Sequence, residues 1–167
     1  HVSSTAAILP GATSTTFDVQ IVDDNVAEHA ETFTVVISNA QNASILLEGD
    51  VATLAVEDDD PLPSVAAEPF VAVREDGVGA TSTAKVVVSL ASGIDSDVTL
   101  EYVTSGTDSA AAGVDYIATT GTLTIPAGMT SGEIPVVVNG DDISEPFESF
   151  QVTISNASSN LGTLAIV

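Results

Sequence analysis

Apolar and polar residues alternate with a period of two over most of the chain, and Val, Ile and Thr dominate these segments. Such alternation puts the apolar side chains on one face of a pleated strand, and β-branched residues suit that half-buried surface. No segment shows the 3.6-residue period of an amphipathic helix. The clearest predicted strands are TFDVQIV (16–22), TFTVVIS (32–38), AKVVVSL (84–90), VTLEYV (98–103), EIPVVV (133–138) and FQVTIS (150–155).

Turn-forming sequences separate the predicted strands. They are LPGAT (9–13), EDGVG (75–79), ASGIDSD (91–97), IPAGMTSG (125–132) and NGDD (139–142). Short strands at this spacing are typical of antiparallel sandwiches, in which each sheet buries one face. The pattern therefore predicts an all-β fold, an immunoglobulin-like antiparallel β-sandwich.

The chain also contains an internal repeat. DDNVAEHAETFTVVISNA (23–40) and DDISEPFESFQVTISNA (141–157) share an acidic pair, two Glu residues, a Phe, an alternating strand and Ser-Asn-Ala. Self-similarity of this kind indicates tandem structural units. The matched pairs, each 117 positions apart, are Asp24 and Asp141, Glu28 and Glu145, Glu31 and Glu148, Phe33 and Phe150, Ile37 and Ile154, and Asn39 and Asn156.

The repeat predicts how the chain divides. Residues 1–60 correspond to the C-terminal half of one unit, and residues 64–167 to a nearly complete second unit that lacks only its closing acidic motif. Pro61 and Pro63 bracket a short linker, 61–63, which two prolines hold extended. We expect the chain to be part of a longer protein. We also expect tandem units joined by so short a linker to form a rod.

Composition narrows the possible partners. The formal charge is −22, from 24 acidic residues against Arg74 and Lys85. Two scattered cations cannot form a phosphate-binding surface, so nucleic acid and anionic membranes are poor partners and a cation is a better one. The chain has no Cys and no apolar run near the roughly 20 residues of a membrane-spanning helix. Catalysis has little support, since no nucleophile, base and acid are arranged together.

The acidic residues are clumped, which suggests either cation sites or charged loops that prevent edge-to-edge aggregation. EDDD (57–60) has the same two interpretations, as ligands or as a charged linker. His1 and His29 are not expected to bind metal, because the repeat does not require them. Asn42 and Asn156 begin NAS sequences, but Asn156 matches Asn39, which has no such motif, so a turn role is favoured over glycosylation.

The chain resembles the Calx-beta domain family over nearly its whole length. In the second unit the resemblance lies in VREDGVGATSTAKVVVSL (73–90), SGTDSAAAGVDYIATTGTLTIPAGMTSGEIPVVV (105–138) and DDISEPFESFQVTIS (141–155). In the first unit it lies in DDNVAEHAETFTVVIS (23–38) and ATLAVEDDD (52–60). The resemblance implies a sandwich that binds Ca²⁺ at one tip.

The family's motifs imply two incomplete sets of calcium ligands here. Asn139 and Gly140 stand where the first unit has acid at Asp23, which weakens one position of the second set. Asp115 precedes Tyr116 and serves equally well as a turn residue or as a ligand. The implied metal ligands are Asp23, Asp24, Glu28, Asp58, Asp59 and Asp60 in the first unit, and Glu75, Asp115, Asp141, Asp142 and Glu145 in the second.

These observations lead to two functional hypotheses. The first is a structural calcium-binding module of a long extracellular or cell-surface protein, forming an adhesin stalk or filament. Its partners are neighbouring repeats of the same chain or identical subunits arranged head to tail. The alternative is a calcium-sensing regulatory domain of a membrane or signalling protein. An enzymatic role is not expected.

Overall fold

The computed structural model describes residues 3–46, 49–106, 108–144 and 146–167. Every regular element among these residues is a β-strand, as the period-two pattern predicted. None of the described residues forms a helix with the length and apolar character needed to cross a membrane. The strands are β1 (Val26–Ala27), β2 (Glu31–Val36), β3 (Val51–Val56), β4 (Val65–Ala67), β5 (Thr81–Leu90), β6 (Gly93–Ile94), β7 (Val98–Ser105), β8 (Thr120–Ile125), β9 (Ser131–Asn139), β10 (Gln151–Ser159) and β11 (Gly162–Thr163).

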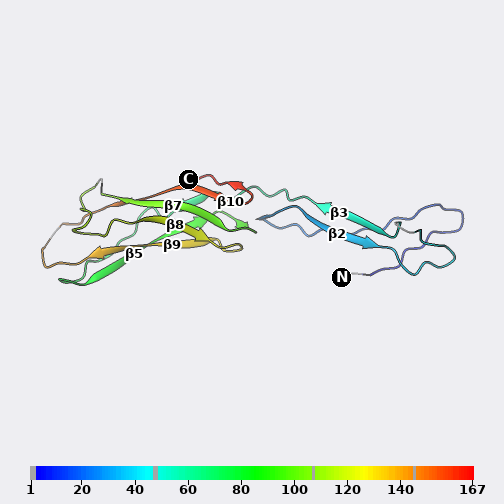
Figure 1. Ribbon diagram of the computed structural model, residues 1–167, viewed down its shortest axis with the longest axis horizontal. Coiled ribbons are helices and arrows are strands. Elements are labelled where there is room, and N and C mark those ends of the chain that lie inside the picture. The colour runs from blue at the N-terminus through cyan, green and yellow to red at the C-terminus, as the bar shows by residue number, and fades with distance from the viewer. Residues whose placement is uncertain (1–2, 47–48, 107, 145) are drawn as a thin grey trace.

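The molecule is elongated, with β2 and β3 at one end and the larger set of strands at the other (Figure 1). We call residues 3–60 the first unit and residues 64–167 the second unit. Within the second unit, β4, β5 and β9 form one antiparallel sheet, and β11, β10, β7 and β8 form another. Alternate residues of both sheets are buried, so the second unit is a β-sandwich and the predicted fold class is confirmed.

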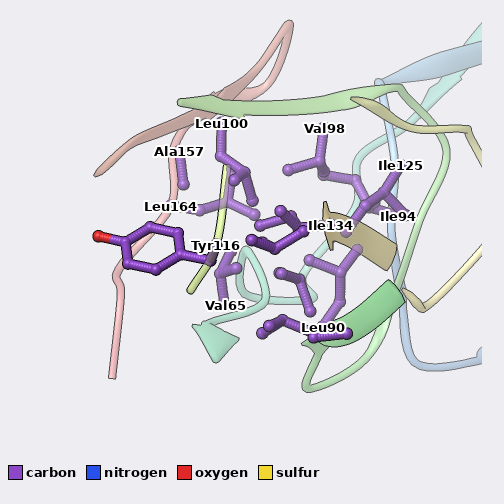
Figure 2. Packing of buried hydrophobic residues seen from close by; sticks show 14 of the residues in the cluster. Val65, Leu90, Ile94, Val98, Leu100, Tyr116, Ile125, Ile134, Ala157 and Leu164 are labelled. Carbon is purple, nitrogen blue, oxygen red and sulfur yellow. The ribbon is translucent and has the colours of Figure 1, made fainter. Parts of the chain in front are cut away.

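The core of the molecule lies between the two sheets of the second unit (Figure 2). Val88 and Ile134 reach it from one sheet, and Leu100 and Ile125 reach it from the other, all with at most 1% of their surface exposed. Tyr116 fills one end, where its ring stacks on Phe150 at a centroid distance of 4.2 Å. Apolar burial of this kind is the main stabilising contribution to the fold.

The predicted strand at 16–22 is not assigned as a strand, and the prediction was wrong in this respect. Its counterpart in the second unit, β9, pairs with β5 along nine residues. The described part of the first unit contains no counterpart of β5, so residues 16–22 have no ladder partner. The alternation of apolar and polar side chains was identified correctly. A strand also needs a neighbouring strand to form hydrogen bonds with its backbone N–H and C=O groups.

The two units also differ at their last strand. In the first unit β3 pairs with β2 over six residues, from Glu31 opposite Val56 to Val36 opposite Val51. In the second unit the equivalent segment begins as β11, which pairs with β10 at Gly162 and Thr163. Its last residues join β4, where the Val65 N–H donates to the Ala165 carbonyl oxygen at 2.8 Å. The first unit offers no β4 counterpart among its described residues, so β3 remains with β2.

One apolar face of the first unit is open. Phe17, Val19 and Ile21 are 55%, 48% and 56% exposed. Their counterparts 117 positions later, Ile134, Val136 and Val138, are 0%, 0% and 5% exposed. The same pattern of side chains therefore forms a core in one unit and a surface in the other.

Candidate metal centre

The acidic residues of the first unit converge at the joint between the units. Asp24 shapes the loop that precedes β1, because its Oδ1 accepts the Val26 N–H at 2.9 Å. Asp58 follows β3, and its Oδ2 accepts the Glu28 N–H at 3.0 Å. This second hydrogen bond joins the acidic loop to the acids that close the unit, although they lie 30 residues apart in sequence.

Two carboxyl groups in this region have raised pKa values. Desolvation raises the pKa of Glu28, and the negative charges of Asp24, Glu31, Asp58 and Asp95 raise it further. Desolvation also raises the pKa of Asp60, followed by the charges of Asp58, Asp59, Asp23 and Asp24. Close carboxylates repel one another in this way, and a bound cation relieves the repulsion. Each of the six implied ligands of the first unit thus interacts electrostatically with at least one other member of the set.

The carboxylates gather without forming a closed ligand cage. Within the described ranges, no group of three or more Asp, Glu, His or Cys side chains is already arranged to hold a metal ion. The donor chemistry nevertheless suits a hard cation, which takes carboxylate and carbonyl oxygens. The first unit provides six carboxylates from two segments, which fits Ca²⁺ in the kind and number of donors.

Asp95 is an acid at this joint that sequence reasoning did not identify. It belongs to the second unit, yet its Oδ2 accepts the His29 N–H at 3.1 Å, and its carboxylate contacts the His29 imidazole Nδ1 at the same distance. The backbone N–H of His29 lowers the pKa of Asp95, with a further contribution from the imidazole. The only available signal was its place in the turn ASGIDSD, which does not reveal a contact across units.

His1 lies outside the described residues.

The acidic loop of the second unit repeats the local geometry of the first. The Asp141 Oδ1 accepts the Ile143 N–H at 2.6 Å, just as Asp24 accepts the Val26 N–H. Asp142 lies beside the turn after Glu75, since a methyl group added at Gly77 would come 4.0 Å from the Asp142 Oδ1. Both acidic loops therefore have the same backbone turn at equivalent positions.

The other implied ligands of the second unit are less well gathered. Asp115 stabilises its own loop, because its Oδ2 accepts the Ala111 N–H at 2.5 Å and its carbonyl oxygen accepts the Asn139 N–H at 2.9 Å. This arrangement matches the turn interpretation of Asp115. Glu75 is exposed, and Glu145 lies outside the described residues.

Gly140 explains why the second unit departs from the acidic pattern. A Cβ at this position would collide with the carbonyl oxygen of Asp76. No side chain fits there, so the acid that the first unit has at Asp23 has no counterpart. The donor set of the second unit is smaller for a steric reason.

Both Asn39 and Asn156 adopt the left-handed conformation, with φ values of 55° and 53°. Asn tolerates this region better than most residues, which accounts for its place in both units. The equivalent conformations show that the repeat extends beyond the acidic loops.

Comparison with known proteins places these features in a family. The model of the Calx-beta domain matches residues 7–60 and 69–166. A search among curated proteins gave no relative. Among solved structures, the apo-form Calx CBD1 domain is 23% identical, with a TM-score of 0.44 over 62% of this chain and 88% of that one.

A second solved structure, CBD12 from CALX1.2, is also 23% identical, with a TM-score of 0.44. The match covers 83% of this chain and 52% of that chain, so this chain spans about half of that structure. The family match, by contrast, extends over most of the sequence and both units. The chain therefore belongs to the Calx-beta domain family of calcium-binding, non-catalytic β-sandwich modules.

Proposed function

We propose that this chain is a structural calcium-binding segment of a long extracellular or cell-surface protein, in which successive units form a stalk or filament. The observation that carries the proposal is the position of the first acidic cluster. Asp24, Glu28 and Asp58 gather where the first unit meets the second, together with Asp95 of the second unit. A cation bound there neutralises the repulsion and stiffens the joint.

The first cluster would hold the ion more strongly than the second. Its ligands would be Asp23, Asp24, Glu28, Asp58, Asp59 and Asp60, and Ca²⁺ takes 6–8 oxygens at about 2.3–2.6 Å. In the second unit the ligands would be Glu75, Asp141, Asp142 and Glu145, with Asp115 already engaged in its turn. Gly140 further reduces the donor set, so we expect weaker binding there.

The open face of the first unit supports a neighbouring unit as partner. Phe17, Phe33 and Leu54 line one open groove. In the second unit the equivalent face is covered by strands from the N-terminal half, of which β5 also pairs with β9. The occupant we propose is therefore the N-terminal half of a Calx-beta unit, with strands equivalent to β4, β5 and β7. It would bury the apolar face and give residues 16–22 their missing ladder partner.

Thermal unfolding in EDTA, Ca²⁺ and Mg²⁺ tests the calcium site. We expect a Ca²⁺-specific rise in melting temperature that Asp58→Asn combined with Asp60→Asn abolishes. Asp18→Asn removes an exposed carboxylate outside the cluster and should retain the full rise. An equal rise with Mg²⁺, or an undiminished rise in the double variant, would show that the acids act only through general screening.

A further inference from the structure

The joint between the units is made by backbone pairing as well as by the linker. β1 of the first unit pairs in parallel with β6 of the second, with Val26 opposite Gly93 and Ala27 opposite Ile94. The Asp95 N–H continues this pairing by donating to the Ala27 carbonyl oxygen at 3.0 Å. The acidic loop of one unit is thus bonded to a Gly-Ile-Asp turn of the next.

The joint is packed as tightly as the interior. Ala27 is 2% exposed and Ile94 is fully buried, and both belong to the main core cluster. A Cβ at Gly93 would lie 3.1 Å from the Val26 Cγ2, so a larger side chain at Gly93 would push the strands apart. The joint is therefore a continuous extension of the second unit's core.

Among the described residues, the second unit contains the same loop without a paired strand. Asp141 and Ile143 match Asp24 and Val26, and the Asp-to-backbone hydrogen bond is present in both loops. Ile143 is 67% exposed and Ser144 is exposed, whereas their counterparts Val26 and Ala27 are half-buried and buried. The loop follows β9, which runs to the end of the second unit remote from the joint (Figure 1).

An exposed apolar pair lies near this loop in sequence. Phe147 is 73% exposed and stacks on Phe70, which is 63% exposed, at a centroid distance of 6.1 Å. Large exposed aromatic side chains are typical of an interaction surface.

We propose that residues 141–144 form a docking site for the Gly-Ile-Asp turn of a further Calx-beta unit. Ile143 and Ser144 take the places of Val26 and Ala27, and the incoming Gly and Ile pair with them in parallel. The inference rests on the proposed succession of units but not on calcium binding, because the contacts are backbone hydrogen bonds and apolar packing. It extends an interface that the molecule already contains.

The second joint differs from the first in one respect. Pro146 occupies the position of His29, and proline has neither a backbone N–H nor an imidazole. The incoming Asp carboxylate therefore lacks the two partners that His29 gives Asp95. The second joint is held by strand pairing and by apolar contact alone.

A three-unit chain tests this proposal. Residues 1–166 are followed by a second copy of residues 57–167, so that the third unit repeats the connection between the first two. Amide hydrogen exchange of Asp95 in the third unit is measured by NMR in EDTA and in Ca²⁺, with Asp95 of the second unit as internal reference. We expect Ile143→Asp, an exposed position, to speed exchange of the third unit's Asp95 amide by about tenfold. Exchange of the reference amide stays unchanged.

Two further variants separate docking from misfolding. Gly93→Val in the third unit alone should give the same loss of protection. Asp95→Ala in the third unit should leave the Ile94 amide of that unit protected, because the second joint has no counterpart of His29 for the Asp95 carboxylate to contact. The tyrosine-detected melting temperature reports that the units remain folded. Protection that survives Ile143→Asp, or that appears only with Ca²⁺, would overturn the proposal.

Discussion

The open face of the first unit leads to a prediction with a matched control in the same chain. Val19 and Val136 occupy equivalent positions, yet Val19 is 48% exposed and Val136 is fully buried. The same substitution, Val→Ala, removes the same atoms at each site. Any difference in effect must therefore come from the surroundings of the side chain.

The expected magnitudes follow from burial. Each CH₂ equivalent lost from a buried site costs about 0.8 kcal/mol of transfer free energy, so two cost about 1.6 kcal/mol. Val136→Ala also leaves an enclosed cavity, which brings the expected loss of stability to about 2–3 kcal/mol. Val19→Ala loses about half of the transfer contribution, or about 0.8 kcal/mol, and leaves no enclosed cavity because the face is open.

Urea unfolding followed by tyrosine fluorescence measures the difference. Both tyrosines, Tyr102 and Tyr116, belong to the second unit, so the signal reports the unfolding of that unit. Val136→Ala should lower this urea midpoint at unchanged slope. Amide exchange of β2 and β3 in urea measures the first unit, where Val19→Ala should cost no more than about 0.8 kcal/mol. Equal losses of stability for the two variants, each measured on its own unit, would refute the conclusion that one face is core and the other is open.

Two further predictions concern sterics and pH. Gly140→Ala should destabilise the second unit by about 1–3 kcal/mol, because its Cβ meets the Asp76 carbonyl oxygen, whereas Gly77→Ala, with its nearest neighbour at 4.0 Å, should be nearly neutral in urea unfolding. In EDTA, the first unit should gain stability as the pH falls from 7 through the raised pKa values of Glu28 and Asp60, since the folded state binds these protons more tightly. This gain in stability is complete below the ordinary pKa values of the two groups, 4.5 and 3.8. It is measured by amide exchange of β3, compared between the parent chain and the double variant Glu28→Gln with Asp60→Asn. A pH profile that is the same in parent and variant would contradict this assignment.

The sequence predicted local structure well where it depends on side-chain alternation. β5, β7, β9 and β10 cover the expected segments, since apolar side chains at alternate positions can be buried only on one face of a sheet. Residues 16–22 have the same alternation but no strand partner in the part of the chain that the structure describes. Pattern alone does not say whether a neighbouring strand is present, and this is why the prediction failed there.

The candidate site was predictable in its parts but not in its assembly. The repeat identified the acidic loops, and both have the same aspartate-capped turn. Asp95 was missed because its contact with His29 crosses 66 residues and joins two units. The steric exclusion at Gly140 was likewise invisible, because it depends on the approach of Asp76 in space.

Hydrogen exchange during a calcium titration tests the central claim most directly. If Ca²⁺ binds at the joint, the amides of Glu28, His29 and Asp95 should gain protection together, with one midpoint, because the ion fixes both sides of the joint. Asp58→Asn with Asp60→Asn should remove this gain, while Asp18→Asn should retain it. Protection that appears elsewhere in the chain, or that leaves these three amides unchanged, would contradict a calcium-stiffened joint.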